Sequence, residues 1–340
     1  MTPQKKITIY QVAQRAGVAI STVSRVLNNS PNVSQSTKDK VNEAIEDLNF
    51  RPQVSARKLA SREPQMLAIA VPSFTTPYYT EVLKGVKDEI EHMDLDIVIY
   101  NTGSKNPTEG LENLFYRGTA DTVITISIDI TESVHKQLQT SGIPIVLIGS
   151  NHPDYNYYDV NNRLGGFMAG EHLVKQGFKK LGMILPSMKT SPSQNRYMGF
   201  VDALKEFKMP VEEKYFVRGD SQKHAGFTEE AGYEAIFEFN KMGEFPDALF
   251  CANDTLAIGA YHAITQLGLR IPEDIAIMGY DNIKFMKYLD ITTVDQMMYN
   301  VGVEATKRLA EIIKNDDGIK IQKTIDPVLV ARKSTEKVSS

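Results

Sequence analysis

Cysteine and tryptophan are almost absent from this chain of 340 residues, which contains one Cys, Cys251, and no Trp. A single cysteine excludes an intrachain disulfide and is typical of proteins kept in a reducing compartment. Cys251 lies in the apolar run 248–252, which favours a buried strand residue over a nucleophile. No stretch approaches roughly 18 consecutive apolar residues, and the N-terminus lacks the apolar core of a secretory signal. We therefore expect a cytoplasmic protein that does not enter a membrane.

Motifs for catalysis and metal binding are missing as well. The sequence contains no Gly-rich phosphate loop, no HExxH and no Cys/His set with metal-ligand spacing. Only six His are present, and none lies in a Ser/His/Asp setting. We therefore predict no catalytic residue, no metal and no cofactor. An enzyme with a doubly wound fold and a transport binding protein are the alternatives, and the missing secretory signal argues against the second.

What the chain does have is an uneven distribution of charge. Residues 1–62 hold ten Lys/Arg and four Asp/Glu, a net charge of +6, whereas the whole chain carries −4. The remainder is therefore acidic. A basic N-terminal segment on an acidic body predicts that this segment alone meets a polyanion.

The segment 8–29 is predicted to form two short helices that meet at Gly17. In the first helix, apolar residues recur at i, i+3, i+4 and i+7: Ile9, Val12, Ala13 and Ala16. Thr8 and Gln11 have the spacing of a capping box, so the helix is expected to begin there. Gly17 suits the left-handed turn that ends a helix.

The second helix combines an apolar face with a hydrogen-bonding one. Its apolar residues are Val23, Val26 and Leu27, and its polar residues are Ser21, Thr22, Ser24, Arg25 and Asn28. Such polar side chains contact phosphates and base edges. Two helices across a tight glycine turn are typical of the helix-turn-helix that binds the DNA major groove. An ordinary helical hairpin with a solvated polar face is the alternative.

Residues 34–48 are predicted to complete a small helical domain, and residues 51–62 are predicted to connect it to the rest of the chain. Ser34 is a good N-cap for a third helix that continues to Leu48. Pro52 suits the first turn of a further short, basic helix over 51–62. A helix this short is marginal by itself and needs a partner to fold, so a plain linker is the alternative.

From Met66 onward, apolar strand-like runs alternate with helical patterns. The expected strands are 66–72, 96–101, 122–127, 144–149, 181–186, 248–253 and 275–280. Near-continuous Val, Ile and Leu runs between helices indicate parallel strands that are buried on both faces. There are too many for one compact sheet, so we expect two lobes.

Several short motifs follow one another in a specific order. The first comprises Thr8, Val12, Ala13, Ala16, Gly17, Val18, Thr22, Val23, Ser24 and Arg25. The later ones are Arg51-Pro52, Ala56-Arg57-x-Leu59-Ala60, Asn162-x-x-Gly165-Gly166, His172-Leu173, Arg196-x-x-Gly199-Phe200, Asn253-Asp254, Ile271–Asp274, Gly279–Asp281 and Arg332–Thr335. Together they resemble the lac repressor (LacI/GalR) family of bacterial transcription regulators over essentially the whole chain.

The resemblance implies an α/β chain with a small all-α helix-turn-helix head, a hinge helix and a two-lobed, doubly wound body like a periplasmic binding protein. We expect the DNA-binding head at 1–50, the hinge helix or linker at 51–63 and an effector-binding and dimerisation domain at 64–340. From the family layout, the first lobe is expected at about 64–161 and 292–325, and the second at about 162–291 and 326–340. The same layout implies a strand at 292–296 and a helix at 301–314 that return to the first lobe. A homodimer is expected to bind a near-palindromic operator in double-stranded DNA.

For DNA binding, the resemblance assigns base contacts to Ile20, Ser21 and Arg25. Arg25 can bond guanine bidentately, whereas Ile20 contacts only apolar groups such as a thymine methyl. Phosphate contacts are expected from Thr8, Thr22, Ser24 and Asn28. In the hinge, Leu59 is a minor-groove wedge or packs against its dimer mate, and Arg57 neutralises phosphate. One departure is Ala19, where the family usually has a capping Ser.

For the effector, the resemblance assigns hydrogen bonds to Arg196 and Asp281, with Asn253 and Asp254 in the same crevice. Tyr78, Tyr79 and Phe227 match rings that pack on ligands; core packing is the alternative for all three, as a structural cap is for Asp281. Asn161 matches a site position at which the family commonly has Asp. An Arg fork and a carboxylate suit a ligand with many hydrogen-bonding groups, such as a sugar.

The predicted function is a repressor of carbohydrate-utilisation genes that a small-molecule effector controls. The alternative is a global catabolite regulator controlled by a phosphorylated partner protein, because Tyr299 resembles a contact residue of that subgroup. Asn300 and Glu311 depart from that subgroup, since acidic and basic partners are expected at their positions. The sequence leaves open which effector binds, and whether it acts as inducer or corepressor.

Overall fold

A computed structural model describes residues 7–27, 30, 32–50, 64, 66–93, 95–187, 190–219, 223–315 and 317–337. The chain divides into two compact units at the bond between Gln65 and Met66. The predicted hinge helix at 51–63, with Arg57 and Leu59, lies outside the described residues, and so does Asn28.

The first unit contains three helices, α1 (Ile9–Ala16), α2 (Ile20–Leu27) and α3 (Gln35–Asp47). Val12, Val23 and Val41, one from each helix, are fully buried against one another. Gly17 ends α1 with a left-handed φ of 66°, as its sequence position predicts. The carbonyl of Ala19 accepts the N–H groups of the first turn of α2, so this helix begins at Ile20 without a serine cap.

The second unit contains two separate parallel sheets. The larger has the strand order β11-β5-β4-β3-β1-β2 among the described residues. Its strands are β1 (Met66–Val71), β2 (Asp96–Asn101), β3 (Thr122–Ile126), β4 (Ile145–Ile148), β5 (Asn156–Val160) and β11 (Gln322–Ile325). All of its pairings are parallel, as the apolar runs predict.

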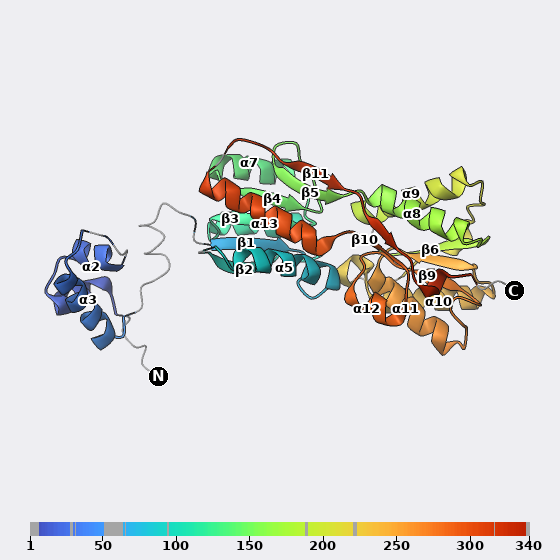
Figure 1. Ribbon diagram of the computed structural model, residues 1–340, viewed down its shortest axis with the longest axis horizontal. Coiled ribbons are helices and arrows are strands. Elements are labelled where there is room, and N and C mark those ends of the chain that lie inside the picture. The colour runs from blue at the N-terminus through green and yellow to red at the C-terminus, as the bar shows by residue number, and fades with distance from the viewer. Residues whose placement is uncertain are drawn as a thin grey trace. The chain divides into compact units, whose positions relative to one another are not determined.

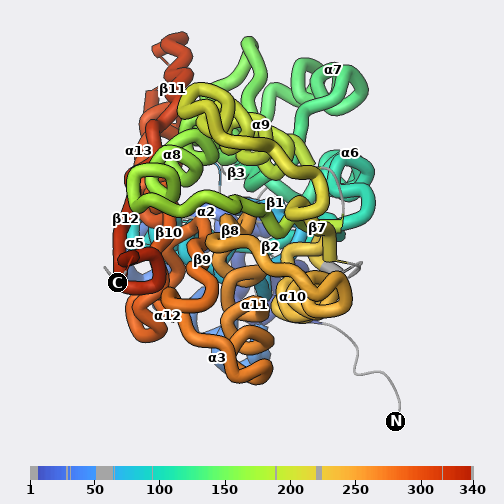
Figure 2. The backbone as a smooth tube through the Cα atoms, turned by 90° about the vertical axis from the view of Figure 1, so that its right-hand side faces the viewer, coloured from blue at the N-terminus to red at the C-terminus, as the bar shows by residue number. Residues whose placement is uncertain are grey.

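Helices cover both faces of this sheet (Figure 2). Leu67 and Ile69 pack towards α5 (Pro77–Ile90) and α13 (Met298–Lys314), whereas Ala68 and Ala70 pack towards α6 (Pro107–Arg117) and α7 (Glu132–Ser141). Successive side chains of β1 therefore point alternately into two hydrophobic cores, one on each face of the sheet. This explains why the strand is apolar without interruption.

The smaller sheet has the order β7-β6-β8-β9. Its strands are β6 (Leu181–Leu185), β7 (Phe216–Arg218), β8 (Ala248–Cys251) and β9 (Ala276–Met278). Helices α8 (Asn162–Lys175) and α9 (Ser191–Glu206) lie on one side of it, and α10 (Glu229–Met242), α11 (Asp254–Gln266) and α12 (Lys284–Leu289) lie on the other (Figures 1 and 2).

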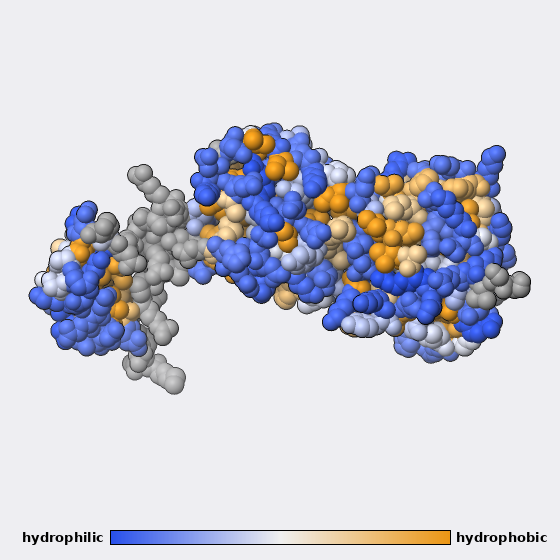
Figure 3. All heavy atoms as spheres, in the orientation of Figure 1, coloured by the Kyte–Doolittle hydropathy of each residue, from blue (hydrophilic) through white to orange (hydrophobic). Residues whose placement is uncertain are grey.

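Between the sheets, the described chain passes from one lobe to the other near 160–162, 295–298 and 325–328. Strands β10 (Thr293–Asp295) and β12 (Val328–Val330) pair antiparallel at this junction. Figure 3 shows apolar atoms at the surface where the two lobes of the second unit meet. Val328, in β12, is exposed. Because the chain crosses between the lobes only at this junction in the described residues, the junction can act as a hinge about which the lobes change their angle.

All eight predicted strands are present, but the predicted burial on both faces is wrong for β2, an edge strand whose residues are mostly exposed. Strands β5, β7, β11 and β12 were not predicted. These four are short, and β5 and β11 contain polar residues where buried parallel strands usually have Val or Ile. The long helix predicted at 301–314 is confirmed and begins three residues earlier, at Met298. Among the described residues, no helix combines the length and apolarity that crossing a bilayer needs.

Candidate functional site

A cavity of about 180 Å³ lies between the lobes, at the carboxyl ends of strands from both sheets. One buried water needs only about 10–15 Å³, so the cavity has room for a small organic molecule. Six of the predicted effector residues line it: Tyr78, Tyr79, Arg196, Phe227, Asn253 and Asp281. The crevice at strand carboxyl ends is where doubly wound folds bind their ligands.

Arg196, on α9, is buried and holds several elements together. Its Nε donates to Oδ1 of Asn162 at 2.8 Å, and its Nη1 donates to the carbonyl of Ala252 at 2.7 Å. Its guanidinium carbon lies 3.7 Å from the centroid of the Tyr280 ring. Gly166 lets α8 approach this closely, because a Cβ there would overlap the carbonyl of Arg196. Two of the donor atoms of Arg196 are therefore already used within the protein.

Asp281, after β9, is buried and has a φ of 122°, a backbone conformation that non-glycine residues rarely adopt. Gln296 Nε2 donates to its Oδ1, and Nη1 of Arg196 lies 3.8 Å from the same oxygen. Burial raises the pKa of the Asp281 carboxyl, and the neighbouring Arg196 charge opposes that shift. The carboxyl lines the cavity, where it can accept a hydrogen bond from a hydroxyl.

The aromatic residues form an apolar wall of the cavity. The rings of Tyr78 and Tyr79, in the first turn of α5, meet edge to face with centroids 5.0 Å apart. Burial raises the pKa of Tyr78 to about 12, although a hydrogen bond with Ser127 opposes this, so the hydroxyl stays neutral. Both tyrosines and Phe227 also pack against the core, so each has the structural role that the sequence left open.

Two predicted effector residues lie beside the cavity rather than in its lining. Asn161 caps α8 by accepting the N–H of Leu164, and its Nδ2 donates to Asp326 Oδ1 at 3.1 Å. Asp254 is fully buried and accepts the hydroxyl of Thr293 at 2.6 Å. These bonds join segments at the lobe junction, and contact of either residue with an effector stays a prediction.

Other polar residues of the cavity were not assigned to the effector from the sequence. Among them are Ser127, Asp159, Asn162, Thr190 and Gln296. Each lies at or just beyond the end of a strand or at the first turn of a helix. Asp159 is held in place because its Oδ2 accepts from Asn151 Nδ2 at 2.8 Å. Position at a strand end is the signal that could have found them.

The predicted DNA-contacting face of α2 is open to solvent. Ile20, Ser21 and Arg25 are exposed, and Thr22 and Ser24 are half-buried. At the start of α1, the N–H of Thr8 donates to Gln11 Oε1 at 2.9 Å, as the predicted capping box requires. An exposed Ile beside hydrogen-bonding side chains is an arrangement that can read the major groove.

Comparison with known proteins accounts for both units. The family described as bacterial regulatory proteins, lacI family, matches residues 8–53, and the periplasmic binding protein-like domain matches residues 171–335. The HTH-type transcriptional repressor PurR of Mannheimia succiniciproducens is 32% identical over 340 residues, covering 98% of this chain and 99% of that protein. The chain belongs to the LacI family.

Other members of the LacI family agree with this assignment. The ribose operon repressor of Haemophilus influenzae is 32% identical, over 96% of this chain and 98% of that one. The structure of the transcriptional regulator CelR in complex with cellobiose has 26% identity and a TM-score of 0.68, over 97% of this chain and 100% of that one. The lac repressor dimer bound to operator and ONPF has the same fold, with 24% identity and a TM-score of 0.79 over 97% and 99% of the two chains.

Membership in the LacI family makes this chain a DNA-binding transcriptional regulator and not an enzyme. The predicted family and the predicted architecture, a helix-turn-helix head followed by a periplasmic-binding-protein-like α/β body, are confirmed.

Proposed function

We propose that this LacI-family regulator represses carbohydrate-utilisation genes and that an uncharged sugar controls it by binding in the cavity. The charge of the lining carries this proposal. Asp159 and Asp281 contribute two carboxyls, against the single guanidinium of Arg196. Because Arg196 is paired with Asp281 and two of its donor atoms already bond Asn162 and Ala252, the carboxyl of Asp159 would repel an anionic effector, whereas sugar hydroxyls can donate to the carboxyls.

Two relatives support a sugar as the effector class. One that is 32% identical is named a ribose operon repressor, and a structure with 26% identity is a complex with cellobiose. Tyr78, Tyr79 and Phe227 line the cavity and supply aromatic rings on which the C–H face of a sugar can pack.

We also propose that two copies of the chain form a homodimer on a near-palindromic operator. Strand β2 lies at the edge of its sheet and exposes Ile97, Val98 and Ile99 by 41%, 39% and 48%. Three consecutive exposed β-branched residues on an unpaired edge form a surface that a partner would cover. The lac repressor, which has the same fold, is described as a dimer on its operator.

On DNA, Ile20, Ser21 and Arg25 are proposed to contact bases, and Thr8, Thr22, Ser24 and Asn28 to contact phosphates. The exposed face of α2 supports the first group. The proposed roles of Leu59 as a minor-groove wedge and of Arg57 in neutralising phosphate concern residues outside the described part of the chain.

Control by a phosphorylated partner is less well supported. The hydroxyl of Tyr299 donates to Asp88 Oδ2 at 3.0 Å, and Glu89 lies on the same helix. A phosphoryl group placed at Tyr299 would therefore face like charge.

A thermal unfolding screen tests the proposal. The full chain is mixed with uncharged pentoses, hexoses and disaccharides, with sugar phosphates and with purines. A ligand at 100 times its Kd adds about 2.7 kcal/mol, enough for a clear rise in Tm. We expect an uncharged sugar to raise Tm, and Asp281→Ala to abolish the rise. Asp202→Ala, on the surface of α9, is the matched control.

The other results of the screen separate the alternatives. A rise in Tm only with a phosphorylated sugar or a purine contradicts the proposed effector class. No rise with any compound, while operator binding is intact, favours control by a partner protein. A chain that lacks residues 1–62 should keep the sugar response and lose operator binding.

A further inference from the structure

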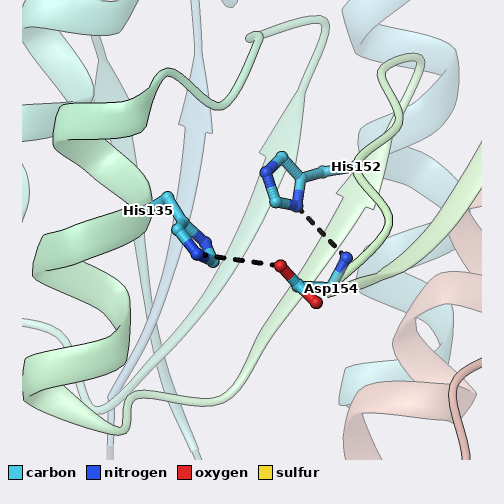
Figure 4. A group of neighbouring side chains, drawn as sticks. All are labelled: His135, His152 and Asp154. Carbon is cyan, nitrogen blue, oxygen red and sulfur yellow. Dashed lines mark hydrogen bonds and ion pairs between the residues drawn. The ribbon is translucent and has the colours of Figure 1, made fainter.

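We propose that His135, His152 and Asp154 form a binding site for a divalent transition metal such as Zn²⁺, in the first lobe and outside the effector cavity. One possible ligand atom from each residue lies within 4.8 Å of the others. His135 comes from α7, and the other two come from the loop that precedes β5 (Figure 4). None of the three lines the cavity, so this site is independent of the proposed effector.

The residue types and spacing suit a Zn²⁺-like ion. His135 Nε2 and Asp154 Oδ2 are 3.7 Å apart, and two ligands of one tetrahedral zinc lie about 3.3 Å apart, given bonds of about 2.0–2.2 Å. The His152 ring lies beside that of His135, with centroids 4.9 Å apart. Two imidazoles and one carboxylate leave a fourth position for water, a common zinc arrangement.

Tyr155 orients one ligand. Its hydroxyl oxygen lies 2.8 Å from His135 Nδ1, on the side of the ring away from Asp154. When Nδ1 donates to that oxygen, the lone pair of Nε2 faces the carboxylate of Asp154 with no proton between them. A cation between the two atoms removes this repulsion, and a hydrogen bond on the second imidazole nitrogen is how proteins usually orient a metal-binding histidine.

The loop that carries the other two ligands is held in place. Gln322 Nε2, on β11, donates to the carbonyl of Pro153 at 2.8 Å, and the N–H of Tyr155 donates to the carbonyl of His152 at 3.2 Å. The backbone of the site is therefore largely formed before any metal binds, which reduces the entropy lost on binding.

Two contacts compete with the metal. The N–H of Asp154 donates to His152 Nδ1 at 3.2 Å, and Lys320 Nζ lies 3.3 Å from Asp154 Oδ1. Binding requires the first bond to be released and the Lys320 charge to move away. If Asp154 is a metal ligand, removal of the Lys320 charge should strengthen metal binding. A chance cluster of histidines would not show this effect.

The test uses the full chain, without an affinity tag and freed of metal by a chelator. Co²⁺ is titrated while the visible absorption of four-coordinate Co²⁺ is followed, and Zn²⁺ affinity is measured by competition with a coloured chelator. We expect one ion per chain. His135→Ala and His152→Ala should each weaken binding by at least about tenfold, because each removes a ligand.

Two further variants complete the test, and Tm shows that each remains folded. Lys320→Met should tighten binding, and His92→Ala, an exposed histidine elsewhere in the lobe, should not change it. Equal affinity of wild type, His135→Ala and His152→Ala overturns the proposal. Absence of the four-coordinate Co²⁺ spectrum, or weaker binding by Lys320→Met, also overturns it.

Discussion

The two units of this regulator place their functional side chains in opposite ways. On α2, residues of one eight-residue helix point outward, and Arg25 forms no ion pair with another described residue. In the cavity, the lining extends from residue 72 to residue 296, and Arg196, Asn253 and Asp281 there are already bonded within the protein. A surface that binds a large polyanion needs suitable side chains on one face of a helix. A site that encloses a small molecule needs side chains from several helices and strands that meet in space.

Arginine shows the difference most directly. Arg25 is exposed and available to a partner, whereas Arg196 is 5% exposed and joins α8, α9 and β8. The same type of side chain is therefore proposed to contact DNA in one unit, and in the other it holds converging segments of the cavity together. Substitutions should separate a binding loss in the head from a stability loss in the body.

The largest effect is expected for Arg196→Ala. It leaves the buried carboxyl of Asp281 without its opposite charge, and breaking such a pair costs about 3–5 kcal/mol of unfolding free energy. Urea unfolding of the full chain measures this loss. Arg163→Ala, which breaks an exposed pair with Asp202, is the control and should cost about 1 kcal/mol or less. Equal losses would refute the positioning role of Arg196.

Arg25→Ala should leave stability unchanged and weaken operator binding by about 1–3 kcal/mol, the value of one bidentate contact with guanine. Fluorescence anisotropy with labelled operator at fixed salt measures it. Arg15→Ala is the control. Arg15 lies in α1 and pairs with Asp47, so it is not part of the proposed DNA-contacting face of α2 and its loss should change operator binding less. Loss of affinity for all DNA sequences alike would assign Arg25 to phosphate, not to a base.

Gly17→Ala should cost the head about 1 kcal/mol, because a Cβ is disfavoured at a φ of 66°. Hydrogen exchange of amides in α1 and α2 reports the loss, and the sugar response should not change. Gly17→Asn, which tolerates this conformation better, is the matched variant and should cost less. If both variants cost the same, the turn does not depend on backbone conformation.

A further expected effect is a change in how the stability of the protein depends on pH. Burial raises the pKa of Asp254, and the neighbouring Asp281 charge adds to the shift. The folded state thus binds more protons than the unfolded one, whose Asp titrates at about 3.9, so stability falls as pH rises above that value. In Asp254→Asn this fall is absent, so its Tm relative to wild type should rise between about pH 4 and pH 7. A constant difference, as expected for the surface change Asp202→Asn, would contradict this.

The sequence predicted the apolar strands well and the polar ones poorly. β1 and β3 were found because strands buried on both faces are apolar without interruption. β5 and β11 were missed because they contain Tyr, Asp, Gln and Lys and are partly exposed. In the site, Arg196 and Asp281 were found from the family resemblance, but Asp159 and Gln296 were not, since no local pattern links residues that distant strand ends bring together.

The sequence by itself determined the helix-turn-helix, the parallel strands and the family, because helical and strand periodicity and short ordered motifs are local properties of the chain. Only the tertiary structure decided that Arg196 is engaged by Asn162 and Ala252, that Asn161 caps a helix at the lobe junction, and that His135 faces Asp154. Each of these depends on contacts between segments remote in sequence, whose meeting is set by the packing of whole sheets and helices.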